Sequence, residues 1–122
     1  MKIQSYKDLV VWQKSINLVK LVYKLTKQLP KSESFGLTSQ MQRSAISISS
    51  NIAEGWARNH RLEFARFLSI SYASAAELET QIIIAKDEYS NISYLTAEQL
   101  LLEIQKMLFT LIKNTKATES RW

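Results

Sequence analysis

The chain has 122 residues, enough for one domain with a core of its own, and its two glycines and single proline are too few for a turn-rich β fold. It contains no cysteine, which excludes disulfides, thiolate zinc sites and cysteine nucleophiles and is typical of a cytoplasmic protein. Lys and Arg outnumber Asp and Glu by 16 to 11, and no stretch reaches the roughly 18 apolar residues of a membrane span, so we expect one cytoplasmic domain over residues 1–122, without membrane association.

Apolar residues recur at helical spacing along most of the chain, and breaks in that spacing divide it into predicted helices. The first predicted helix covers residues 6–29 and ends before Pro30, because proline disfavours helical geometry in the residue before it. A short polar connection leads to the second, over residues 36–58, and a tight junction leads to the third, over residues 61–88.

The fourth predicted helix covers residues 96–116 and begins with a capping box. In that box the hydroxyl of Thr96 accepts from the amide of Gln99, whose side chain reaches back. Beyond this helix we expect residues 117–122 to fray. Four helices joined by short loops predict an all-α fold, an antiparallel up-down-up-down four-helix bundle.

The first predicted helix has an unusually wide apolar surface, made of two stripes about a third of a turn apart. A surface helix of a monomeric bundle usually has one apolar face little more than 100° wide, and large exposed apolar patches are uncommon on monomers. We therefore expect self-association through the second stripe, with dense packing inside the bundle as the alternative. The first stripe is Leu9, Trp12, Ile16, Val19 and Tyr23, and the second is Val11, Leu18, Val22, Leu25 and Leu29.

A row of polar residues flanks the apolar stripe of the second predicted helix and continues on the third. Buried polar groups need hydrogen-bond partners, so we interpret the row as a structural network that fixes helix register and subunit geometry, with a ligand site as the alternative. The residues of this polar row are Gln40, Ser47, Asn51, Glu54, Arg58 and Glu77.

Catalytic and metal-binding patterns are missing from the sequence. His60 is the only histidine, and no nucleophile is positioned beside it for general-base chemistry. Zinc sites usually draw on several His or Cys ligands, and no glycine-rich loop is present to hold a phosphate. We expect a protein that is not an enzyme and uses no metal or cofactor.

The positive charge is concentrated in the first half of the chain, and it marks candidate phosphate contacts. Four lysines recur at i, i+4, i+7 and i+11 and so share one face of the first predicted helix. Such a stripe predicts nucleic-acid binding with strong salt dependence, although we find no aromatic residue interleaved among the lysines for base stacking, and a solvated lysine face is the alternative. The candidate contacts are Lys20, Lys24, Lys27, Lys31, Arg43, Arg58 and Arg61.

Six short blocks stand in a fixed order along the chain: Tyr6 to Lys14, Leu29-Pro30, Phe35-Gly36-Leu37 with Gln40 and Arg43, Ser47-Ile48, Asn51 to Gly55, and Ser74 with Glu77-Leu78-Glu79. Through these blocks the sequence resembles the bacterial four-helix-bundle proteins encoded in intervening sequences of large-subunit ribosomal RNA genes. It departs from that family at Ser49, where proline is frequent, at Ala73, where glycine is usual, and at Ala75, where leucine is usual.

The resemblance implies an all-α bundle that assembles as a homopentameric ring with a central channel and has no enzymatic activity. The sequence is more distantly similar to the accessory protein of diversity-generating retroelements, a positively charged pentamer that binds nucleic acid and a reverse transcriptase. From both, we expect a non-catalytic oligomer that binds nucleic acid, RNA in preference to DNA, through a basic surface. A protein-interaction scaffold without a nucleic-acid role is the alternative.

Overall fold

The computed structural model describes residues 2–117, and over this range the chain is all-α, with four long helices and no strand. The helices are α1 (Val10–Thr26), α2 (Leu37–Ala57), α3 (Arg61–Glu88) and α4 (Leu95–Ala117). Two single-turn 3-10 helices accompany them, η1 (Tyr6–Asp8) before α1 and η2 (Lys31–Glu33) between α1 and α2. The expected fraying of residues 118–122 lies outside the described residues.

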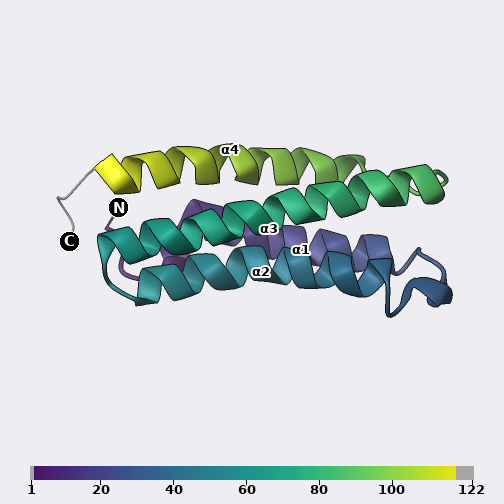
Figure 1. The fold of residues 1–122 in the computed structure, drawn as a ribbon, viewed down its shortest axis with the longest axis horizontal. Helices are drawn as coiled ribbons and strands as arrows, with labels where there is room; N and C mark the ends of the chain where they lie inside the picture. The colour runs from purple at the N-terminus through teal and green to yellow at the C-terminus, as the bar shows by residue number, and fades with distance from the viewer. Residues whose placement is uncertain (1, 118–122) are drawn as a thin grey trace.

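The four helices lie side by side along the long axis, and the chain turns back at each connection (Figure 1). The α1–α2 and α3–α4 connections lie at one end of the molecule, and the α2–α3 junction lies at the other (Figure 1). Within the described chain α1 packs against α2 and α4, α3 packs against the same two helices, and the backbones of the diagonal pairs do not approach each other closely. This diagonal separation keeps the surface of α1 apart from that of α3.

Each helix contributes one apolar stripe to a single core, as its sequence spacing predicts. The hydrophobic effect drives these stripes together because each one removes apolar surface from water. The largest side chains that are almost fully buried include Leu18, Val22, Met41, Ile48, Ile52, Phe64, Leu68, Leu78, Ile82, Ile104 and Leu108.

The helix expected over residues 6–29 is divided at Leu9, whose backbone is extended (φ −74°, ψ 124°). Ser5 begins η1 with a capping box, in which its hydroxyl accepts from the amide of Lys7 and the Asp8 carboxylate accepts from the amide of Ser5. This capping box starts the single turn, the extended backbone of Leu9 ends it, and α1 therefore starts only at Val10.

The capping box expected at Thr96 is wrong, because α4 begins at Leu95 and Thr96 lies inside its first turn. The carbonyl of Tyr94 accepts from the amide of Glu98 at 2.9 Å, and the Tyr94 hydroxyl donates to the carbonyls of Ala85 and Tyr89 at 3.0 and 2.9 Å. The start of α4 is therefore tied to the end of α3 by a buried tyrosine.

One hydrogen-bonded carboxylate joins the two connections at the same end of the bundle. The Tyr89 hydroxyl donates to Glu33 Oε2 at 2.6 Å, and the Leu37 amide donates to Glu33 Oε1 at 3.2 Å, which caps the N-terminus of α2. The bond from Tyr89 and the bond from the Leu37 amide lower the pKa of Glu33, and the same carboxylate raises the pKa of Tyr89. This contact holds the α1–α2 connection in place.

Candidate nucleic-acid interface

The four lysines expected to share a face are all exposed on α1 and the connection that follows it. Lys20 and Lys24 lie on α1, Lys27 directly follows that helix, and Lys31 begins η2. None of the four ion pairs formed within residues 2–117 includes any of them. We call Lys20, Lys24, Lys27 and Lys31 the lysine surface, and its charges are available to an anion.

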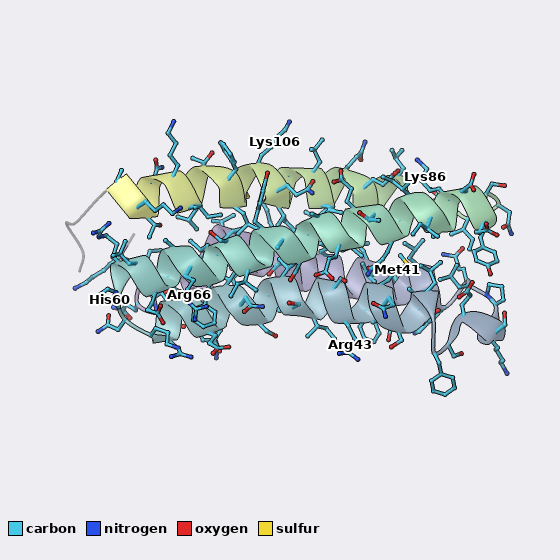
Figure 2. The ribbon with its side chains drawn as sticks, viewed as in Figure 1. Met41, Arg43, His60, Arg66, Lys86 and Lys106 are labelled. Atoms are coloured by element: carbon cyan, nitrogen blue, oxygen red, sulfur yellow. The ribbon has the colours of Figure 1, made fainter. Side chains whose placement is uncertain are left out.

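The three candidate arginines do not join the lysine surface. Arg43 is exposed on α2, where Figure 2 shows it pointing away from the bundle. Arg58 and Arg61 flank the α2–α3 junction at the opposite end of the molecule from Lys31. The structure therefore does not bring the seven predicted phosphate contacts together.

Arg58 and Arg61 also have partners within the chain. The Arg58 guanidinium pairs with Glu54 at 3.0 Å and lies 5.1 Å from the ring centroid of Phe67. Arg61 Nη1 donates to the carbonyls of Thr115 and Lys116 at 3.4 and 2.6 Å and so closes the C-terminal end of α4. The i, i+4 spacing of Glu54 and Arg58 predicts the first of these roles, while charge patterning does not reveal that of Arg61.

One exposed aromatic ring, that of Tyr23, lies between lysines on α1, so the expectation that none is interleaved there is wrong, and a second exposed ring follows Lys31 in the connection. Tyr23 is 39% exposed on α1 beside Lys24, and Phe35 is 100% exposed at the end of the connection that contains Lys31. The sequence places Tyr23 on an apolar stripe and Phe35 in a short loop. Neither position reveals by itself that the ring faces solvent.

The second apolar stripe of α1 is not a subunit interface, and this expectation is also wrong. α2 and α4 pack on either side of α1 and cover the stripe, so the alternative of dense packing inside the bundle is correct. In the first stripe, by contrast, Trp12, Ile16 and Val19 are half-buried and Tyr23 is exposed. The five side chains of the second stripe are at most 7% exposed: Val11, Leu18, Val22, Leu25 and Leu29.

A different apolar surface, missed by sequence reasoning, lies where α3 and α4 meet. Ile83 and Phe109 are each 61% exposed, Leu102 is 50% exposed, and the rings of Tyr72 and Phe109 lie 6.3 Å apart. We call Tyr72, Ile83, Leu102 and Phe109 the α3–α4 apolar face. Large apolar side chains gathered in this way on a surface favour an interaction site.

Part of the polar row forms a hydrogen-bond network between α2 and α3. The hydroxyls of Ser47 and Ser74 lie 2.8 Å apart, and Asn51 Nδ2 donates to the carbonyl and the hydroxyl of Ser47 at 2.8 and 3.0 Å. Buried Ser71, outside the predicted row, donates to the carbonyl of Ile48 at 2.8 Å. These bonds fix how the two helices lie against each other.

The other members of the polar row do not extend this network. Glu54 is paired with Arg58 on the surface of α2. Gln40 and Glu77 are exposed, and within residues 2–117 the side chain of neither one takes part in a hydrogen bond. The predicted network is therefore smaller than expected and is centred on Ser47.

No group of three or more His, Asp or Glu side chains within residues 2–117 is arranged to hold a metal ion. His60 is exposed at the start of α3, at the end of the molecule where Figure 2 labels it. No helix in the described part of the chain is both long and apolar enough to cross a membrane.

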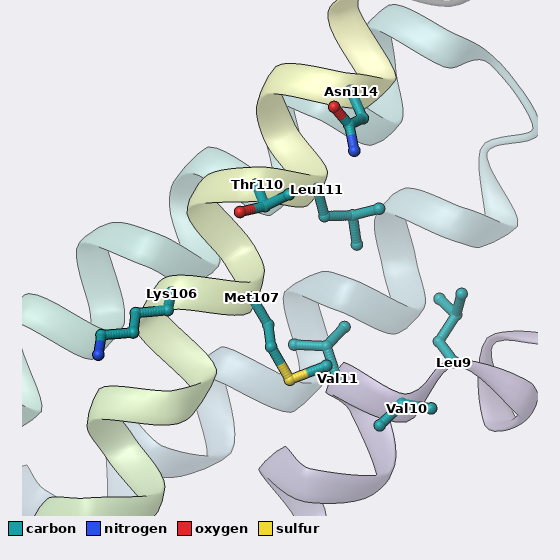
Figure 3. A pocket seen from close by; sticks show the side chains of 8 residues that line it. All are labelled: Leu9, Val10, Val11, Lys106, Met107, Thr110, Leu111 and Asn114. Atoms are coloured by element: carbon teal, nitrogen blue, oxygen red, sulfur yellow. The ribbon is translucent and has the colours of Figure 1, made fainter.

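A shallow groove of about 490 Å³ lies between the start of α1 and the end of α4 (Figure 3). Val11 and Met107 line it with other apolar side chains, while Lys106 points away from them (Figure 3). A small-molecule site usually combines an apolar pocket with a few convergent polar groups, and this groove has no such convergence.

Comparison with known proteins finds a matching family model and similar solved structures. A family model described as 23S rRNA-intervening sequence protein matches residues 7–111. Among solved structures, the chain is similar to a protein of unknown function from the S23 ribosomal protein family of Bacteroides thetaiotaomicron VPI-5482, at 27% identity and a TM-score of 0.75, over 85% of this chain and 99% of that one. No protein of curated function matches at a significant level.

Proposed function

Because this chain belongs to the 23S rRNA-intervening sequence protein family and carries an unpaired lysine surface, we propose that it is a non-catalytic, self-associating protein that binds nucleic acid. The observation that carries the proposal is that four exposed lysines within twelve residues have no acidic partner in residues 2–117. We expect RNA in preference to DNA from the family resemblance, although the family name describes an intervening sequence and not a ligand.

The spacing of the lysine surface suits a phosphate backbone. Lys20 and Lys27 lie about 10 Å apart along the helix axis, at 1.5 Å per residue. Each lysine that neutralises a phosphate releases a condensed counterion, and this release drives binding without regard to sequence. The proposed activity is therefore salt-dependent and has little base specificity of its own.

Self-association would repeat the lysine surface around an assembly. The proposal takes the protomer as an antiparallel up-down-up-down bundle, which the alternating ends of its connections support (Figure 1). The α3–α4 apolar face supplies a contact for a neighbouring copy, and a pentamer is the number that the family resemblance implies. A closed ring is the usual outcome when one surface docks onto a different surface of the next copy.

The test compares two variants that lose the same number of charges. One carries Lys20→Gln, Lys24→Gln, Lys27→Gln and Lys31→Gln; the matched control replaces four lysines elsewhere with glutamine. In fluorescence anisotropy with a single-stranded RNA at about 0.1 M salt, the first variant binds roughly tenfold or more weakly, because it lacks four phosphate contacts. The lysines replaced in the control are Lys2, Lys106, Lys113 and Lys116.

The same affinity loss in both variants would contradict the proposal, because binding would then depend on total charge and not on the lysine surface.

The α3–α4 apolar face also favours the scaffold alternative. Absence of RNA binding, together with capture of a specific protein that survives nuclease treatment and moderate salt, would favour that alternative.

A further inference from the structure

The side chain of Phe35 is fully exposed at the end of the α1–α2 connection, next to the lysine surface. We propose that Phe35 is a stacking platform for an unpaired base of a single-stranded nucleic acid whose phosphates are held by Lys27 and Lys31. This inference rests on the proposed function and adds to it the class of ligand and a residue that recognises bases.

The connection presents the ring on an ordered backbone. The amide of Glu33 donates to the carbonyl of Pro30 at 2.9 Å, that of Ser34 to Lys31 at 3.0 Å, and that of Gly36 to Glu33 at 3.0 Å. The Glu33 carboxylate also bonds the α2 N-terminus and Tyr89. Because the backbone around Phe35 is already held, a base that stacks on the ring pays little additional ordering entropy.

Two exposed lysines of the connection can contact a polyanion beside Phe35. Lys27 and Lys31 are exposed in the same connection, and Glu33 is its one acidic residue. Both carboxylate oxygens of Glu33 accept hydrogen bonds, so its negative charge is partly compensated within the chain. Asp87 and Glu88, at the end of α3 beside Tyr89, also add negative charge near this connection, so Lys27 and Lys31 are the groups that must contact the phosphates.

Stacking on an exposed ring requires the face of an unpaired base, and every base has one. In a duplex the base faces are already stacked on each other, so Phe35 adds nothing to duplex binding. A membrane is a poorer fit to this loop, because the residues flanking Phe35 are Ser34 and Gly36. Insertion into a bilayer surface needs a larger apolar area than one side chain provides.

The test measures RNA affinity by fluorescence anisotropy for Phe35→Ala, Phe35→Leu and Phe35→Tyr, on a single-stranded RNA and on a duplex of equal charge. Phe35→Ala and Phe35→Leu weaken single-strand binding by roughly 5- to 100-fold, as expected for loss of one stacked base, and leave duplex binding unchanged. Phe35→Tyr keeps the ring and the affinity. The salt slope stays as in the unmodified protein, because no phosphate contact is lost.

The matched control is Leu62→Ala, which removes an exposed apolar side chain at the other end of the bundle and leaves both affinities unchanged. If Phe35→Ala binds single strands as well as the unmodified protein while the four-lysine variant does not, this inference falls and the proposed function stands. If no form of the protein binds RNA, both the inference about Phe35 and the proposed function are contradicted. A change in assembly mass on Phe35→Ala would place the ring in a subunit contact and overturn the inference.

Discussion

At Gly55, α2 and α3 approach so closely that an added Cβ would lie 2.5 Å from Cβ of Phe67 and 3.2 Å from Cδ1 of Phe64. A glycine inside a helix costs about 1 kcal/mol of helix propensity relative to alanine, so its presence there needs a packing reason. The close approach supplies that reason. It also brings Ser47 within hydrogen-bond distance of Ser74.

Gly55→Ala should therefore destabilise the protein, although alanine is the better helix former. Overpacking a well-filled core typically costs about 1–3 kcal/mol, and here the clash is with a Cβ near the backbone that has little freedom to move. After the gain of about 1 kcal/mol in helix propensity, we expect a net loss of up to about 2 kcal/mol in the free energy of unfolding, measured by urea denaturation.

Ser50→Ala is the control for this substitution, because Ser50 is exposed on the same helix. Its stability should stay within about 0.5 kcal/mol of the unmodified protein. An unfolding free energy for Gly55→Ala equal to or above that of the unmodified protein would show that α2 and α3 have room to separate.

The arginines show why the site could be predicted only in part at the residue scale. The i, i+4 spacing of Glu54 and Arg58 predicts their ion pair, but the sequence does not give the partner of Arg61, which is the end of α4. The lysine surface could be predicted because helical spacing alone puts Lys20, Lys24 and Lys27 on one side of one element. The exposure of Phe35 could not be predicted, because it depends on how the loop folds.

Among the elements, the helices were predictable, and so were those ends that have a local sequence signal. Pro30 and the Asn59–His60 junction are local signals, and α3 begins and ends at its expected residues. Asn59 adopts a left-handed conformation (φ 52°), as is common just after a helix. The start of α4 instead depends on the hydroxyl of Tyr94 reaching the end of α3, a tertiary contact that helical periodicity does not contain.

Helical periodicity also does not show which of the two apolar stripes of α1 is buried. Both have helical spacing and both are apolar, so the sequence does not say which one the bundle covers. The positions of α2 and α4 decide which stripe is covered. These two helices bury the stripe that includes Leu18 and Val22.

The bond between Glu33 and Tyr89 predicts how the connections respond to pH. The pKa of Glu33 is lowered from its ordinary 4.5 by the bond from Tyr89 and by the Leu37 amide, so its stabilising effect is present above pH 4.5 and is lost as pH falls through the lowered value. The pKa of Tyr89 is raised above its ordinary 10.0, so its effect is present below pH 10 and is lost at higher pH.

Thermal unfolding of the unmodified protein and of Glu33→Gln between pH 7 and pH 3 checks this dependence. Glu33→Gln should have the lower Tm at pH 7, and the difference should shrink below pH 4.5, where the carboxylate of the unmodified protein becomes protonated. Tyr89→Phe removes the hydroxyl that donates to Glu33. Its Tm difference from the unmodified protein should shrink over the same pH range. A Tm difference that stays constant over the whole range would contradict the assignment.

At the scale of the whole molecule, the α3–α4 apolar face gathers several exposed apolar side chains, whereas the second stripe of α1 is buried. We expect the protein to self-associate through this face. Leu102→Lys together with Phe109→Lys places two desolvated charges in the contact and should give monomers by light scattering. Because both side chains are at least half exposed, helicity and Tm should change little.

Leu62→Lys serves as the control for assembly, because this exposed leucine lies outside the α3–α4 apolar face. It should leave the assembly mass unchanged. A monomeric unmodified protein, or an assembly that survives both lysine substitutions on the face, would rule out the α3–α4 contact.

The central claim is that the lysine surface binds the phosphates of RNA, and the salt dependence of binding by the unmodified protein tests it most directly. If four lysines each neutralise one phosphate of a single strand, the logarithm of the association constant falls against the logarithm of the salt concentration with a slope of about −3 per protomer engaged. We predict a slope at least this steep. Binding with a slope near zero, or no binding at low salt, would contradict the account.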